Sequence, residues 1–166
     1  MIEDQRTVFH NIGLYLSMKE LRKGAQSLSL AERIYFVVYQ FDCELLNGGI
    51  DQYLFNSSGN YANEAISAFS KIGAARSSEL VEKLMSFFPE QRVPTDRGER
   101  MSLLKNLMDD TGFMELEREI THSYWEDEDN VTSLLILYYE NNREDFDPID
   151  FDVPLSLFDA EPRDCL

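Results

Sequence analysis

The chain has 166 residues, of which 43% are hydrophobic and 12% aromatic, and this is enough for one domain with a packed core. Its 31 acidic and 15 basic residues give a formal net charge of −16, which argues against direct binding to nucleic acid or to an anionic membrane. There is no run of about 18 apolar residues and no apolar signal-peptide core, so we expect a cytoplasmic protein without a membrane segment.

The first part of the chain shows helical periodicity with clear breaks. Apolar residues over 8–21 predict a first helix. Ser29 and Glu32 form a capping-box pattern that begins a second helix, which is expected to end at the Asn47-Gly48-Gly49 break. A short helix over 50–56 should follow and end at Ser57-Ser58-Gly59. The glycines in these breaks would permit positive φ.

Five further helices are predicted from the same periodicity. Their apolar residues span 62–69, 80–88, 101–108, 113–124 and 131–138. Thr95 or Asp96 could cap the helix over 101–108, and Asp129 or Asn130 the last one. The sequence therefore predicts an all-α fold, a compact single-domain bundle of about eight helices over residues 1–143, without a convincing strand.

Residues 144–166 have a different character and are expected to form an extended acidic tail. This stretch holds three of the five prolines and is rich in Asp and Phe. In an extended Asp-Phe-Asp triplet the carboxylates project to one side and the ring to the other. We therefore expect Phe146, Phe151 and Phe158 to dock part of the tail on the helical body.

The negative charge is concentrated in the last two-fifths of the chain. Residues 1–100 hold 13 acids and 11 bases, whereas residues 101–166 hold 18 acids and 4 bases. Glu115 and Glu119 are four residues apart on one helix, where like charges repel, so this spacing does not serve stability. Such a surface either is a solvated face or binds a basic partner. The candidate partner-binding acids are Asp109, Asp110, Glu115, Glu117, Glu119, Glu126, Asp127, Glu128, Asp129, Asp145, Asp147, Asp150 and Asp152.

Catalytic and cofactor motifs are missing from the sequence. Phosphate-binding loops, dinucleotide-binding glycine patterns and nucleophile elbows do not occur. His122 follows Glu119 by three residues, but a di-iron bundle needs a second such pair and further glutamates. Cys43 lies among acids that would raise a thiol pKa, which favours a structural role. We therefore expect neither an enzyme nor a bound metal or cofactor.

Residues 32–74 carry a family resemblance. The pattern E-R-I-Y-x-x-V-Y-Q-F-D-x-E-x-x-N-G-G-x-x-Q-Y-x-x-N-S-S-G-x-Y-A-x-E-A spans Glu32 to Ala65, and K-I-G-A follows at Lys71 to Ala74. This resembles the bacterial DNA-mimic protein family. The resemblance implies an all-helical homodimer whose acidic surface imitates the charge of double-stranded DNA and binds a helix-turn-helix transcription regulator. The motif itself is interpreted as a structural staple between helices, so no functional residue follows from it.

Three functions are consistent with these features. The first is a DNA mimic that blocks a DNA-binding protein, with its carboxylates in place of phosphates. The second is an immunity or antitoxin-like inhibitor of a basic toxin enzyme, with tail phenylalanines as the apolar centre of the interface. The third is an enzyme of unrecognised type, which would require a pocket with convergent acids and perturbed pKa values.

Overall fold

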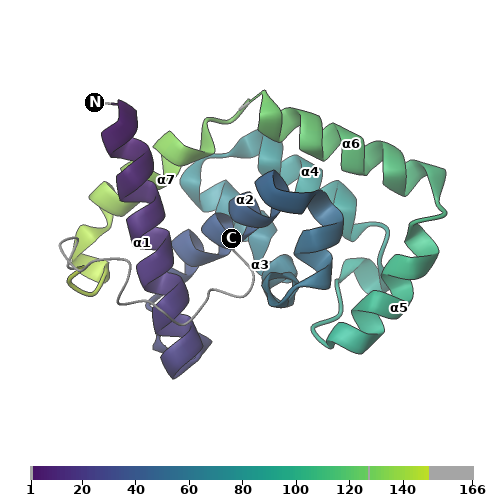
Figure 1. The fold of residues 1–166 in the computed structure, drawn as a ribbon, viewed down its shortest axis with the longest axis horizontal. Helices are drawn as coiled ribbons and strands as arrows, with labels where there is room; N and C mark the ends of the chain where they lie inside the picture. Colours follow the sequence, from purple (N-terminus) through teal and green to yellow (C-terminus); the bar gives the residue numbers. More distant parts are fainter. Residues whose placement is uncertain (1, 127, 150–166) are drawn as a thin grey trace.

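A computed structural model describes residues 2–126 and 128–149, and in these residues the chain is entirely helical with irregular connections (Figure 1). The predicted all-α fold is confirmed. Among the described residues there are seven α-helices instead of about eight, because the second and third predicted helices are two parts of one kinked helix, α2. The helices are α1 (Ile2–Lys23), α2 (Leu30–Phe55), α3 (Ala62–Ile72), α4 (Ala75–Met85), α5 (Arg97–Leu107), α6 (Thr111–Trp125) and α7 (Val131–Asn141), with short 3₁₀ turns η1 (Ala25–Ser27), η2 (Ser57–Tyr61), η3 (Pro89–Gln91) and η4 (Arg143–Asp145).

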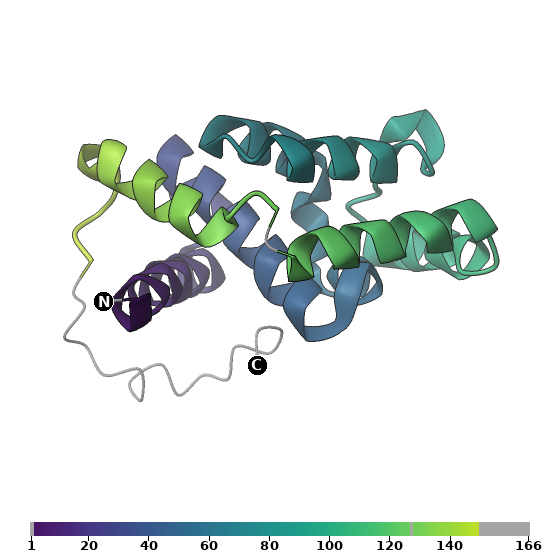
Figure 2. The same ribbon diagram turned by 90° about the horizontal axis from the view of Figure 1, so that it is seen from above.

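Helix α2 is the centre of the molecule, and the other helices surround it (Figures 1 and 2). It packs against α1, α3, α5, α6 and α7. Val38, Tyr39 and Phe41, which point in different directions around the helix, are all fully buried. A helix that is apolar on every side needs neighbours on every side, so this segment fixes the architecture. None of the helices in the described residues could span a bilayer.

The predicted helix starts are confirmed by side-chain caps. Ser29 Oγ accepts from the Glu32 amide at 3.1 Å, and the Glu32 carboxylate accepts from the Ser29 amide at 2.8 Å. Asp96 caps α5, accepting the Glu99 amide at 2.8 Å. Of the two candidates for the last helix, Asn130 is the cap of α7.

The kink in α2 lies at Gly49, where φ is 79°. Of the three glycines that would permit positive φ in this stretch, Gly49 uses that freedom, whereas Gly48 and Gly59 do not. Gly59 is required for space instead. A Cβ there would lie 2.8 Å from Arg100 Nε and 2.9 Å from the Tyr53 carbonyl oxygen.

A buried polar network holds the kink, and we call it the kink network (Glu44, Gln52, Asn56, Ser58 and Arg100). The Glu44 carboxylate is fully buried and accepts from Gln52 Nε2 at 2.7 Å, Asn56 Nδ2 at 3.0 Å and Ser58 Oγ at 2.8 Å. These residues come from both sides of Gly49. The predicted staple between helices is therefore built around one carboxylate.

Arg100 completes the kink network from α5. Its guanidinium is fully buried and donates to the carbonyls of Leu54 at 2.6 Å, Asn56 at 3.0 Å and Pro94 at 2.8 Å. Burial lowers the pKa of Arg100. The end of α2 leaves carbonyls without helical partners, and Arg100 satisfies them.

The beginning of the predicted tail is part of the helical body. Phe146 is buried and packs against Tyr35 and Tyr139 with ring centroids 6.1 and 4.9 Å away, as expected for a docking residue. The Asp147 amide donates to the Glu32 carboxylate at 3.0 Å. Phe151 and Phe158 lie outside the described residues. Residues 146–149 therefore contact the helical body.

Candidate functional site

The predicted acidic residues do not gather in one place. The turn between α5 and α6 lies at one end of the long axis of the molecule, and the segment after α7 lies at the other (Figures 1 and 2). The acids near α6 form the larger group, and we call the exposed ones the α6 acidic surface (Asp109, Asp110, Glu115, Glu119, Glu126 and Glu128).

Part of the α6 acidic surface carries unneutralised charge. Asp109, Glu115 and Glu126 are exposed and make no ion pair within the part of the chain that the structure describes. Asp110 is exposed as well, but its carboxylate caps α6 by accepting the Phe113 amide at 2.9 Å. Along α6, Glu115 and Glu126 are separated by about 16 Å of helix rise.

Arg76, on α4, neutralises another part of this surface. Its guanidinium donates to Glu119 at 2.7 Å, Glu128 at 3.2 Å and Glu79 at 3.2 Å. Glu119 also lies 3.5 Å from Lys83 Nζ. The hydrogen bond to Glu119 raises the pKa of Arg76. A basic partner would have to share these carboxylates with Arg76. The positive charge of Arg76 therefore weakens the attraction between the carboxylates and the partner.

Asp129 has a structural role. Its carboxylate accepts from the Ser77 amide at 2.6 Å, the Ser77 hydroxyl at 2.7 Å and the Arg76 amide at 3.2 Å. It therefore caps the beginning of α4 from a distant loop, where a negative charge is also favoured by the helix dipole. Such a carboxylate has little capacity left for a partner.

Glu117 lies apart from the other acids of α6. It is half-buried and faces the kink of α2, where an ideal Cβ on Gly49 would be 3.6 Å from its carboxylate. Burial and the nearby charge of Asp51 raise the pKa of Glu117, and burial raises that of Asp51. One Asp51 oxygen is buried without a hydrogen-bond partner among the described residues. This carboxylate pair costs stability when both groups are ionised.

The remaining predicted acids belong to the end of the chain. Asp145 and Asp147 are exposed. Asp147 lies 2.8 Å from Lys19 Nζ, and this ammonium lowers the pKa of Asp147. Their place beside α1 separates them from the α6 acidic surface. Asp127, Asp150 and Asp152 lie outside the described residues.

The arrangement of the histidines, the described cysteine and the acids bears on metal binding. Within residues 2–126 and 128–149 no three His, Cys, Asp or Glu side chains come together as a metal site. His10 Nδ1 lies 2.9 Å from the hydroxyl of Tyr39, and burial lowers its pKa. Cys43 is a half-buried free thiol.

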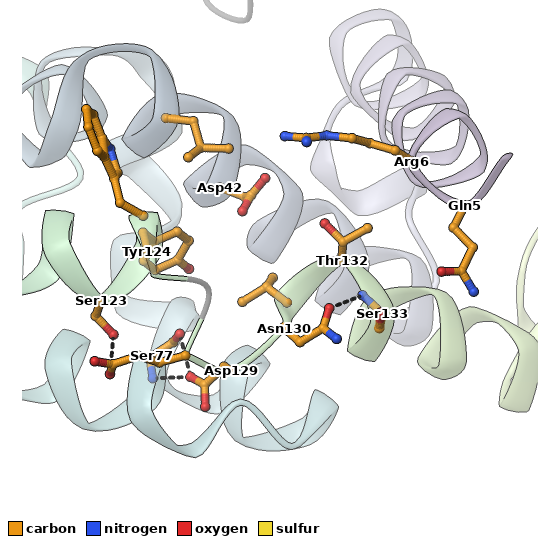
Figure 3. A pocket seen from close by; sticks show the side chains of 14 residues that line it. Gln5, Arg6, Asp42, Ser77, Ser123, Tyr124, Asp129, Asn130, Thr132 and Ser133 are labelled. Atoms are coloured by element: carbon orange, nitrogen blue, oxygen red, sulfur yellow. Dashed lines mark hydrogen bonds between the residues drawn. The ribbon is translucent and has the colours of Figure 1, made fainter. Parts of the chain in front are cut away.

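A cleft of about 500 Å³ opens beside the α6 acidic surface (Figure 3). Its walls come from the first turns of α1, the middle of α2, the end of α6 and the beginning of α7. Trp125 and Leu46, two exposed apolar residues, both line it. One signal in the sequence could have pointed to this site, since Trp125 is the single tryptophan and precedes a run of acids.

Comparison with known proteins gives one match. The family model of DMP19-like proteins, a DNA-mimic family, matches residues 26–142. No curated protein and no solved structure matches the chain. The matched region runs from η1 to the end of α7 and includes the whole kink network. The match covers well over half of the chain, and the chain therefore belongs to the DMP19-like family.

Proposed function

We propose that this protein is a DNA mimic: its α6 acidic surface occupies the DNA-contacting surface of a DNA-binding protein, a helix-turn-helix transcription regulator, and blocks access to DNA. The observation that carries the proposal is that Asp109, Glu115 and Glu126, on or next to α6, are exposed and make no ion pair among the described residues. Membership of the DMP19-like family supports it. The protein would act in the cytoplasm as a homodimer, without binding nucleic acid itself.

Physical chemistry favours a DNA-binding partner for such a surface. A protein that binds DNA has lysine and arginine placed to replace phosphate counterions. Carboxylates at the surface of α6 would attract the same side chains and accelerate the encounter. Because the attraction acts between exposed charges, it should weaken steeply as salt rises.

The alternative, an inhibitor of a basic toxin enzyme, loses part of its support. That interpretation used Phe146, Phe151 and Phe158 as the apolar centre of an interface. Phe146 is buried between Tyr35 and Tyr139, whereas Phe151 and Phe158 lie outside the described residues. Phe146 cannot be reached by a partner in this fold.

A charge-matched pull-down tests the proposal. The site variant is Asp109→Asn with Glu115→Gln and Glu126→Gln. The control variant is Glu82→Gln with Glu90→Gln and Glu99→Gln, three exposed acids outside the surface. Both variants lose three negative charges. Wild type and control should retain a DNA-binding regulator from the native lysate at low salt, and duplex DNA should release it. The site variant should retain markedly less of it.

Two results would contradict the proposal. If the site and control variants lose the regulator equally, only net charge matters. If duplex DNA fails to displace the regulator, then DNA and this protein bind different surfaces of the regulator. Light scattering of the purified protein tests the homodimer independently, and a monomer at micromolar concentration would refute that part.

A further inference from the structure

The cleft beside α6 has an apolar edge that the folded chain leaves exposed. Trp125 is 75% exposed and Leu46 is 47% exposed. Trp125 is the last residue of α6, so its backbone is fixed by the helix. An exposed indole ring adds little burial energy to the folded monomer. Tryptophan is, however, among the residues that contribute most to binding at protein interfaces.

A second hollow of about 360 Å³ borders the cleft, and Arg6, Asp42 and Leu46 line both. In Figure 3, Arg6 reaches toward the cleft from α1, and Asp42 lies between it and Tyr124. The space is thus long enough for more than one side chain of an incoming segment.

The charges around the cleft favour a positively charged occupant. Its lining contains three carboxylates, those of Asp42, Glu128 and Asp129, and one guanidinium, that of Arg6. Arg6 comes from α1, on the wall facing Ser123 and Asp129 (Figure 3). On the α6 side the exposed Glu126 directly follows Trp125. An anionic segment would be repelled from that side, and a cationic one attracted.

Arginine fits this combination better than lysine. A guanidinium can stack on an indole face and still donate hydrogen bonds in its own plane to a carboxylate. Glu128 lines the same cleft, and its side chain is 41% exposed although it bonds to Arg76 and Ser123. Proteins that contact DNA carry such arginines on their binding surface.

We propose that this cleft receives an arginine and a neighbouring apolar side chain of the partner, the guanidinium stacked on Trp125 and paired with Glu128, and the apolar group against Leu46. The inference rests on the proposed function, since it names the contact that a DNA-binding partner would make. It adds a short-range anchor to the long-range attraction of the α6 acidic surface. The anchor would distinguish one basic partner from another, which net charge alone does not do.

Tryptophan fluorescence tests the cleft without the partner, because Trp125 is the single tryptophan. The probes are the peptides acetyl-Arg-Leu-Arg-amide, acetyl-Lys-Leu-Lys-amide and acetyl-Glu-Leu-Glu-amide. The arginine peptide should change the emission saturably and bind about threefold or more tightly than the lysine peptide. The glutamate peptide should have no effect. Glu128→Gln should weaken the arginine peptide, and Leu137→Ala, an exposed leucine outside the cleft lining, should not.

The regulator captured in the pull-down gives the second measurement. Trp125→Ala should lower its affinity about tenfold and leave the slope of affinity against salt unchanged, because no charge is removed. The site variant at Asp109, Glu115 and Glu126 should lower that slope. Circular dichroism would verify that Trp125→Ala folds.

The outcomes separate the two proposals. If the regulator is captured but Trp125→Ala binds it normally and no peptide changes the emission, the cleft proposal fails and the mimic function stands. If the arginine peptide saturates the cleft and no regulator is captured, the cleft proposal stands and the mimic function fails. If emission changes only with protein concentration, as the chain dimerises, the cleft is a contact between two copies and the arginine proposal is overturned.

Discussion

The kink network and the α6 acidic surface are both rich in charged and polar groups, yet they use them in opposite ways. In the kink network, Glu44 and Arg100 are fully buried and form their hydrogen bonds with neighbouring segments of the chain. On the α6 acidic surface, Asp109, Glu115 and Glu126 face solvent. A buried polar group must be satisfied internally, whereas an exposed one is free to meet a partner.

This contrast explains why the recognisable motif says little about binding. Asn56, Ser58 and Gly59 are constrained because each touches the network or leaves room for it. The carboxylates of Glu115 and Glu126, by contrast, make no ion pair with any other described residue. Proteins of this architecture can therefore keep the kink and vary the surface, so the partner must be sought on the surface.

Arg100→Ala should produce the largest effect. It removes the donor to two carbonyls at the end of α2 and to that of Pro94 and opens a cavity, so we expect a loss of about 3–5 kcal/mol in the free energy of unfolding. Urea unfolding followed by circular dichroism measures it. The control is Arg97→Ala, an exposed arginine with one carbonyl partner, Phe55, at 2.9 Å. It should cost less than about 1 kcal/mol. Equal losses would contradict the central role of Arg100.

Gly59→Ala should come next, with a loss of about 1–3 kcal/mol from overpacking. The added methyl group would push on Arg100 Nε and on the backbone of Tyr53. Gly98→Ala, in the exposed first turn of α5, serves as comparison and should change stability by no more than about 0.5 kcal/mol. Thermal unfolding of both variants measures the two changes. If Gly59→Ala leaves the Tm unchanged, the contact of the new methyl group with Arg100 and Tyr53 is relieved at little cost.

Asp129→Ala tests the border between the two regions. Asp129 belongs to the acidic run in sequence but caps α4 in the fold, so its loss should cost about 1–2 kcal/mol. Glu126→Ala removes the same charge from an exposed site and should stay within about 0.5 kcal/mol. If both variants unfold at the same urea concentration, the cap contributes nothing measurable.

Glu117→Gln should have the smallest effect, and in the opposite direction. Because burial raises the pKa of Glu117 in the fold, its ionised form is disfavoured there and lowers stability above that pKa. Glutamine removes the charge, so the Tm at neutral pH should rise by no more than about 2–4 °C. The gain should shrink as the pH falls through the raised pKa, where the wild-type carboxyl becomes neutral. A gain that persists in acid would point to a cause other than charge.

Local patterns in the sequence determined the helices. Periodicity, the Ser29–Glu32 capping box and the Asp96 and Asn130 caps act over a few residues, so they can be recognised before any tertiary contact is known. The concentration of acids after residue 100 was also visible. The burial of Phe146 could be predicted because its acidic neighbours in sequence cannot shield the ring from water, so it gains free energy only by packing on the helical body.

Tertiary structure alone decided which acids are available. Arg76 neutralises Glu119 and Glu128, residues 43 and 52 positions away, and Asp129 caps α4 from a comparable distance. Glu117 and Glu119 are two residues apart, but one faces α2 and the other α4. The cleft at Trp125 is formed by α1, α2, α6 and α7 together. The sequence shows which residues are charged. Whether a charge is neutralised depends on which helices pack side by side, and local sequence patterns do not reveal that packing.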